Sequence, residues 1–257
     1  MAATEHAVEV EGLWKRYLAG PRGHSIKSAV VSHVLRRSTD QELPWAVQDV
    51  SFTAESGDSV AVIGPNGSGK TTLLGLLSKV LAPSRGRLVV RGRVCVLLEA
   101  AVAFHPDMSG IENIMLQGMV LGMSRREARA HLDEIIAFAQ AEAYVDAPVR
   151  TYSLGQRARL GFAVASHLGP DVFLIDEVLA VVDQEFHFAC YDRIREMRRQ
   201  GCTILFVSHV LDQVRELCDR TIWLDQGRVV MDAATAEVLP RYEALSAEHH
   251  QHPRGGQ

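Results

Sequence analysis

The chain has 257 residues, of which 47% are hydrophobic and 23% are charged, as in ordinary globular proteins. This composition excludes intrinsic disorder, collagen-like repeats and small disulfide scaffolds. Lys and Arg total 27 against 31 Asp and Glu, and the resulting net charge of −4 gives no electrostatic reason to expect nucleic acid as a partner.

No run of residues has the length and apolar character of a membrane helix. A span needs about 18 uninterrupted apolar residues, and the best candidate, residues 88–104, is interrupted by two arginines and a glutamate. The first ten residues lack the basic segment and apolar core of a secretion signal, so we expect a cytoplasmic chain. Its cysteines have no CxxC spacing and are expected to be small buried hydrophobic residues, without a disulfide or a metal. They are Cys95, Cys190, Cys202 and Cys218.

Hydrophobic periodicity predicts three early strands, at Val8–Val10, Ala46–Phe52 and Ser59–Ile63. The third strand leads through a glycine-rich turn into a predicted helix, Thr71–Val80. The pattern from Glu112 to Ala141 is helical and predicts a helical subdomain. Ser124 and Glu127 have the spacing of a capping box there. An apolar stripe follows in the same stretch, made of Ala128, Leu132, Ile135 and Ala139.

Strands and helices alternate in the last part of the chain, which indicates βα units around a parallel sheet and therefore an α/β fold. The predicted elements are a strand at Val172–Ile175, a helix at Gln184–Gln200, a strand at Thr203–Val207 and a helix at Val210–Leu217. Residues 225–228 predict a hairpin turn, and the polar residues 249–257 are expected to be disordered.

A phosphate-binding loop (P-loop) is the clearest motif, because residues 64–71 read GPNGSGKT between a predicted strand and a predicted helix. Its glycines let backbone N–H groups surround phosphate oxygens at the start of the helix. Lys70 would neutralise the β- and γ-phosphates, Thr71 would offer its hydroxyl to Mg²⁺, and Thr72 could reach the α-phosphate. The candidate ATP-binding residues of the loop are Gly64, Pro65, Asn66, Gly67, Ser68, Gly69, Lys70, Thr71 and Thr72.

Polar residues follow two later apolar strands. Asp176 and Glu177 end the segment VFLIDE, where Asp176 would hold Mg²⁺ and Glu177 would polarise the water that attacks the γ-phosphorus. The alternative is a helix N-cap followed by a first-turn acid. His209 follows the segment ILFVSH and is interpreted as a γ-phosphate contact, with a structural histidine as the alternative.

The segment Tyr152-Ser153-Leu154-Gly155-Gln156, which we call the signature segment, decides between P-loop families. The order of P-loop, signature segment, acidic strand end and histidine resembles ABC-type ATPases from about residue 8 to residue 239. The resemblance implies a RecA-like mixed sheet core, an antiparallel β subdomain and a helical subdomain at about 105–168. It also implies a homodimer in which Ser153 and Gly155 bind the γ-phosphate of ATP held by the opposite subunit, although an ordinary Ser N-cap would look the same.

The same resemblance implies two further contacts. Asp183 would lie in a loop that crosses the dimer interface. Tyr17 would stack on adenine, with Trp14 and Trp45 as alternatives.

Departures from the common pattern point to a subfamily. Glu99 stands where the common loop has Gln, and it is a further candidate metal contact. This Glu, the segment FHPDMSGIENI, the Tyr-Ser start of the signature segment and the segment DEVLAVVD resemble ABC ATPases that export O-antigen, capsule or teichoic acid. That likeness implies a separate integral membrane permease, a lipid-linked glycan as indirect substrate, and a peripheral location on the cytoplasmic face of the inner membrane. The alternatives are another lipid or drug exporter and a soluble ABC protein.

The expected domain spans residues 1–240, followed by a short tail at 241–257 and no carbohydrate-binding domain. Residues 18–44 form a basic insertion, in which Lys27, Arg36 and Arg37 accompany apolar residues at helical spacing. Two interpretations stay open for it: a helix at the membrane partner, or a solvated surface loop.

Overall fold

The computed structural model describes residues 6–17, 44–97, 104–176 and 183–251, with side chains described as far as residue 245. In this part of the chain the strands form an antiparallel three-stranded sheet, ordered β2-β1-β4, and a mixed six-stranded sheet, ordered β5-β6-β7-β3-β8-β9. The strands are β1 (Val8–Lys15), β2 (Val47–Ala54), β3 (Ser59–Ile63), β4 (Arg85–Val90), β5 (Val94–Leu97), β6 (Val172–Ile175), β7 (Thr203–Val207), β8 (Arg220–Asp225) and β9 (Arg228–Ala234).

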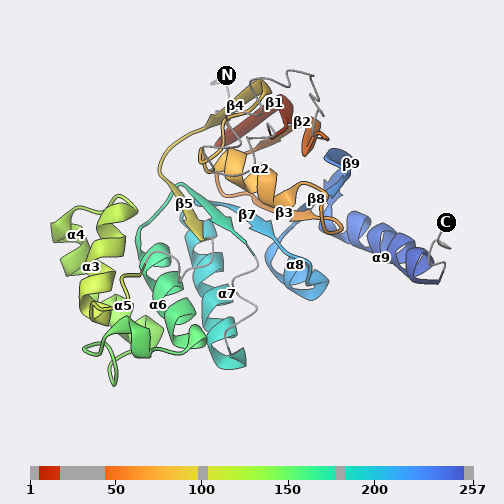
Figure 1. Ribbon diagram of the computed structural model, residues 1–257. Coiled ribbons are helices and arrows are strands. Elements are labelled where there is room, and N and C mark those ends of the chain that lie inside the picture. Colours follow the sequence, from red (N-terminus) through yellow and green to blue (C-terminus); the bar gives the residue numbers. More distant parts are fainter. Residues whose placement is uncertain (1–5, 18–43, 98–103, 177–182, 252–257) are drawn as a thin grey trace, which may run out of the picture.

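Most of the described helices lie on the side of the six-stranded sheet that faces away from the three-stranded sheet (Figure 1). Helix α2 lies between the two sheets, and α3, α4 and α5 form a separate group next to α6 and α7. The helices are α2 (Lys70–Leu77), α3 (Gly110–Val120), α4 (Arg125–Ala130), α5 (Leu132–Ala139), the 3₁₀ helix η1 (Val149–Thr151), α6 (Leu154–His167), α7 (Gln184–Arg199), α8 (Leu211–Leu217) and α9 (Thr235–Gln251).

Strand β3 shows how the sequence places the sheet between two cores. All five of its residues are buried. Because side chains alternate along a strand, Val60 and Val62 pack with α2 and the three-stranded sheet, whereas Ala61 and Ile63 pack on the other face with α6, α7 and α8. Burial on both faces requires a continuous apolar run, which is the sequence signal that identified this strand.

The helical subdomain has its own core, which includes Ile114, Ile135, Val149 and Leu160. The predicted helical stretch is three helices, because α3 ends at Val120 and a second start follows at Ser124. Ser124 and Glu127 form the predicted capping box, with the Glu127 amide donating to Ser124 Oγ at 3.2 Å.

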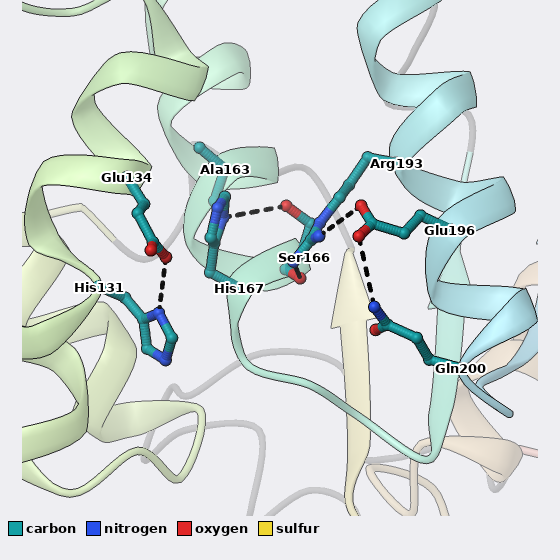
Figure 2. Close-up of polar contacts among 8 residues, drawn as sticks. All are labelled: His131, Glu134, Ala163, Ser166, His167, Arg193, Glu196 and Gln200. Atoms are coloured by element: carbon teal, nitrogen blue, oxygen red, sulfur yellow. Dashed lines mark hydrogen bonds and ion pairs between the residues drawn. The ribbon is translucent and has the colours of Figure 1, made fainter.

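Helices α6 and α7 are fastened to each other by Arg193 (Figure 2). Its guanidinium donates to the backbone oxygen of Ser166 on α6 at 3.0 Å and to Glu196 on its own helix at 2.8 Å. On the facing side of α6, the His167 ring N–H donates to the Ala163 oxygen at 2.7 Å. The Arg193 bond joins α6 to α7, whereas the His167 bond is internal to α6.

The observed α/β architecture confirms the predicted fold class, with parallel strands β5, β6, β7, β3 and β8 at its centre. The four cysteines are buried and free, as expected of small hydrophobic residues. Among the described residues, none of the helices combines the length and the apolar character that crossing a membrane requires.

The disorder expected for the last residues needs a partial correction. Residues 249–257 were expected to be disordered, but helix α9 continues to Gln251, and residues 252–257 lie outside the described residues. Its first part is anchored because Val238 and Leu239 are buried in the main core and Tyr242 contacts Trp223, with ring centres 5.3 Å apart. This apolar face extends helix formation beyond the point at which the sequence becomes polar.

Candidate functional site

The strand register brings three sequence motifs to one edge of the six-stranded sheet. Ile175 of β6 pairs with Phe206 of β7, and Val207 of β7 pairs with Val62 of β3, in parallel throughout. Asp176, His209 and the P-loop therefore follow neighbouring strands at their carboxyl ends, where open α/β sheets bind ligands. The sequence predicted that the strand before His209 neighbours the strand before Asp176, and the register of β6 and β7 agrees with this.

The P-loop presents the start of helix α2 without a side-chain cap. Gly69 caps the helix in a left-handed conformation, with φ of 103°, and, as a glycine, it makes no side-chain cap hydrogen bond. A Cβ at position 69 would lie 2.3 Å from the Ala46 oxygen, so only glycine fits. Uncapped amides at a helix N-terminus form a ready site for anions such as phosphate.

Two buried polar side chains in the loop fit an anionic ligand. Lys70 is 8% exposed and donates from Nζ to the oxygens of Gly64 at 2.7 Å and Pro65 at 3.1 Å. Ser68 is 2% exposed, and its Oγ has no hydrogen-bond partner among the described residues. A buried polar atom without a partner is costly, and a phosphate oxygen would supply an acceptor for both groups.

Four other loop residues are open to solvent, whereas Gly64 and Thr72 are buried. Pro65, Asn66, Gly67 and Thr71 are exposed, and a Cβ added at Gly67 would meet nothing within 4 Å. The Thr71 hydroxyl is therefore accessible on the first turn of α2.

Tyr17 lies beside the P-loop helix α2. Its hydroxyl is 3.2 Å from Thr72 Oγ1 on α2, and the residue is 45% exposed. The Lys15 ammonium is 5.7 Å from the ring centre. An accessible aromatic face next to α2 suits stacking on adenine.

The two rival tryptophans are engaged with each other and with arginines. The Trp14 and Trp45 rings meet edge to face, with centres 5.1 Å apart. Arg16 and Arg85 stack on Trp45 at 4.9 and 5.3 Å. Their rings are thus used in packing, and both residues are less exposed than Tyr17.

The signature segment forms the beginning of helix α6. Ser153 is its N-cap: Ser153 Oγ accepts from the Gln156 amide at 3.1 Å, and the Gln156 side chain accepts from the Ser153 amide at 2.8 Å. Leu154 is 54% exposed at the first position of the helix, followed by half-buried Gly155. The geometry exposes the start of α6, and it also satisfies the N-cap alternative.

Tyr152 has a structural position instead of an exposed one. It is 5% exposed in the core of the helical subdomain, and its hydroxyl donates to the Tyr144 oxygen at 2.8 Å. Burial raises the pKa of Tyr152 to about 12. A Cβ at Gly110 would lie 2.4 Å from this hydroxyl, so the tyrosine ties the signature segment to the start of α3.

The segment that follows Phe104 is bound to the residues before the signature segment. Asn113 is fully buried, accepts from the His105 amide at 2.7 Å, and donates to the oxygens of His105, Met108 and Ser109. The Val149 amide donates to Met108 at 2.9 Å. This network explains the motif FHPDMSGIENI as a rigid loop, a role that the sequence did not reveal.

Asp183 is the N-cap of α7 and accepts from the Phe186 amide at 3.1 Å. It also forms an ion pair with Arg159 of α6, a partner that sequence reasoning missed. The Arg159 guanidinium, hydrogen-bonded to Asp183, lowers the pKa of that carboxyl, and the Phe186 amide acts in the same direction. The only signal for Arg159 in the sequence was its position on the helix that the signature segment opens.

Several predicted residues lie outside the described residues. These are Glu99, Glu177 and the basic insertion at residues 18–43 with Lys27, Arg36 and Arg37. Their predicted roles stay predictions.

Comparison with known proteins adds independent evidence. A family model described as ABC transporter matches residues 47–180, just over half of the chain. The O-antigen export system ATP-binding protein RfbB of Klebsiella pneumoniae is 42% identical over 202 residues, which cover 79% of this chain and 82% of that protein. The RfbB of Myxococcus xanthus is 45% identical over 212 residues, but the match covers 82% of this chain and only 48% of that protein. This chain therefore spans about half the length of the Myxococcus relative.

Two further comparisons extend the picture. The teichoic acids export ATP-binding protein TagH of Listeria monocytogenes is 40% identical over 199 residues, 77% of this chain and 59% of that protein. A solved ATP-binding cassette, dimeric in a post-hydrolysis state with ADP and Pi bound, has a TM-score of 0.72 at 20% identity, with coverage of 89% and 98%. At that identity the second likeness speaks for the fold alone.

Proposed function

Because the chain belongs to the ABC transporter family, we propose that it is the ATP-hydrolysing subunit of an exporter that moves a lipid-linked polysaccharide across the cytoplasmic membrane. The observation that carries the substrate class is the 42% identity with the O-antigen export protein of Klebsiella pneumoniae, over 82% of that protein's length. The 40% identity with the teichoic acid exporter TagH of Listeria monocytogenes points to the same kind of cargo, a glycan on a lipid carrier.

The P-loop binds the phosphates of ATP. The uncapped amides of α2 face the phosphate oxygens, and Lys70, now held by two carbonyl oxygens of its own loop, transfers to the β- and γ-phosphates. Tyr17 stacks on the adenine ring from beside Thr72.

Hydrolysis transfers the γ-phosphoryl group to water. Glu177 accepts a proton from the attacking water while the bond from the γ-phosphorus to the bridging oxygen breaks, which leaves ADP and phosphate. His209, which follows β7 at the same sheet edge, donates to the γ-phosphate.

The donor set suits Mg²⁺. The Thr71 hydroxyl and the Asp176 carboxylate are hard oxygen ligands at one sheet edge, which this cation prefers, and Glu99 is a further candidate. When bound, Mg²⁺ would neutralise charge on the β- and γ-phosphate oxygens.

Two copies of the chain work together. The open start of α6, at Ser153 and Gly155, contacts the γ-phosphate held by the second copy, and the Asp183 loop crosses the interface. Closure and reopening of the dimer drive a separate membrane permease, on whose cytoplasmic side the chain is peripherally bound. In this arrangement the glycan itself contacts the permease.

The experiment for the ATPase role is the Glu177→Gln variant of the full chain. ATP binding should remain, while turnover should fall by about 10²-fold or more because the attacking water loses its proton acceptor. Turnover within a few-fold of wild type would remove Glu177 from this role.

The cargo is tested by depletion of this chain in cells. A lipid-linked glycan should accumulate on the cytoplasmic side of the membrane. Accumulation of another lipid, with normal glycan export, would assign the chain to a different exporter.

A further inference from the structure

A chain of side-chain hydrogen bonds connects the start of α7 with the loop that carries His209. Gln213 of α8 lies at its centre: its Nε2 is 3.1 Å from His187 Nε2 on α7, and its Oε1 accepts from Ser208 Oγ at 3.2 Å. Ser208 Oγ in turn accepts from the Val210 amide at 3.0 Å. The chain therefore brackets His209 on both sides, at Ser208 and at Val210.

The donors and acceptors give this chain a defined direction. With the Gln213 amide nitrogen turned toward His187, as in this structure, the nitrogen donates and His187 Nε2 accepts, which fits a neutral ring with its proton on Nδ1. Ser208 and Gln213 are 1% and 9% exposed, so neither can replace a lost partner freely with water. A loss at His187 is consequently transmitted to the backbone around His209.

We propose that His187, Gln213 and Ser208 are positioning residues that hold the His209 loop in its hydrolysis-competent conformation. The proposal rests on the proposed role of His209 at the γ-phosphate. His187 lies one turn after Asp183, the residue proposed to reach the second copy, so the chain also links the dimer-facing end of α7 to the histidine loop.

Protonation of His187 would place its Nε2–H against the N–H of the Gln213 amide and break this hydrogen bond. Burial lowers the pKa of His187 below its ordinary value of 6.5, whereas Glu216 on α8 acts in the opposite direction. The Tyr191 ring, 4.6 Å away on α7, also faces the imidazole, and Arg195 holds Glu216 at 2.7 Å. Because the pKa of His187 is lowered in the folded protein, the series of hydrogen bonds through neutral His187 is intact above pH 6.5. It is lost as the pH falls through this lowered pKa.

The test measures the ATPase kcat and KM of the purified full chain between pH 5 and 8. His187→Leu and Gln213→Leu should each lower kcat at pH 7.5 by about five- to tenfold, with little change in KM for ATP, because a buried bond that holds the loop is lost. The double variant should lose no more than either single one. His187→Gln keeps an acceptor that does not titrate, so kcat at pH 7.5 should recover to within about twofold of wild type and the acidic fall of kcat should weaken.

His167→Gln is the matched control, because His167 is also a helical histidine whose pKa burial lowers, and it lies within the contacts of α5, α6 and α7 (Figure 2). It should keep the wild-type acidic fall. A wild-type kcat in His187→Leu, or an unchanged acidic fall in His187→Gln, would overturn the proposal.

His209→Ala separates this proposal from the proposed function. If His209→Ala loses turnover while His187→Leu does not, only the positioning chain fails. If His209→Ala keeps turnover, the role of His209 fails, and any loss in His187→Leu then has another cause. Where both lose turnover, adding His187→Leu to His209→Ala should cause no further loss, and an additive loss would overturn the proposal.

Discussion

The guanidinium of Arg159 and the carboxylate of Asp183 form an ion pair that joins the helix opened by the signature segment to the N-cap of α7. Arg159 also donates to the side chain of Gln140, which ends α5, and it lies 5.0 Å from the ring centre of Phe186. One side chain therefore connects α5, α6 and α7. In the proposed dimer, this ion pair connects the Asp183 loop, which reaches the second copy, to helix α6, which contacts the ATP of that copy.

Arg159→Met should uncouple these helices while it keeps an aliphatic side chain against Phe186. The hydrogen bonds to Gln140 and Asp183 are lost, so ATP turnover should fall several-fold whereas ATP affinity, set by the P-loop, should stay unchanged. Steady-state ATPase and equilibrium nucleotide binding check the two quantities. Arg215→Met is the matched control, because Arg215 bridges Asp212 and Glu243 on the surface of α8 and α9. Equal effects of the two substitutions would contradict a specific role for Arg159.

The sequence alone predicted the elements whose signal is local. The strand at Ser59–Ile63 required only a continuous apolar run, and the P-loop required only its glycines, its lysine and its place between strand and helix. The register then joined Asp176 and His209 to it, as parallel strands demand. A further capping box, at Ser109 and Glu112, has the same spacing as the predicted one at Ser124 and could have been found in the same way.

The relationships that the sequence did not predict depend on segments that meet only in the folded chain. Arg159 contacts Asp183 across 24 positions, and Gln213 contacts His187 across 26. The local sequence around Arg159 or Gln213 does not specify its hydrogen-bond partner, because an Arg or Gln on a helix can equally well point into solvent. The continuation of α9 past the polar start of the tail has a similar origin, since its anchor at Trp223 is a tertiary contact.

Asn113 and Gln117, one turn apart on α3, should differ in how much stability they lose on replacement by Leu. Asn113 is fully buried with its amide bonded to the preceding loop, so Asn113→Leu should lower the free energy of unfolding by about 2 kcal/mol. Gln117 Oε1 is buried without a partner among the described residues, so Gln117→Leu should change stability by less than about 0.5 kcal/mol. Urea unfolding of both variants provides the comparison. A similar loss of unfolding free energy in the two variants would show that helix packing, and not the hydrogen bonds of Asn113 to the loop, determines their stability.

Two glycines of the P-loop should separate folding from nucleotide binding. Gly67 has φ of 80° with open space around a Cβ, so Gly67→Ala should cost only the left-handed strain of about 1–2 kcal/mol while it weakens ATP binding. Gly69→Ala adds a backbone clash at 2.3 Å with Ala46 and should destabilise the fold by more than about 3 kcal/mol. Thermal unfolding with and without ATP tests both. Equal Tm values for the two variants would show that the clash with Ala46 does not destabilise Gly69→Ala further.

The last prediction distinguishes Tyr17 from Trp45 as the adenine platform. Tyr17 is 45% exposed and lies beside Thr72, whereas the Trp45 ring is engaged by Trp14, Arg16 and Arg85. Stacking of a base on an aromatic ring contributes about 1–3 kcal/mol, so Tyr17→Ala should weaken ATP binding by about tenfold or more.

Tyr17→Phe keeps the ring and loses only the contact with Thr72, so ATP affinity should stay within about twofold of wild type. Trp45→Leu should lower the Tm, because it removes an edge-to-face contact and two stacked cations, yet it should leave ATP affinity unchanged. Titration with a fluorescent ATP analogue, together with thermal unfolding, measures both quantities for each variant. If Trp45→Leu abolished nucleotide binding at an unchanged Tm while Tyr17→Ala bound normally, the base would stack on Trp45, and the tryptophan pair would have to open to receive it.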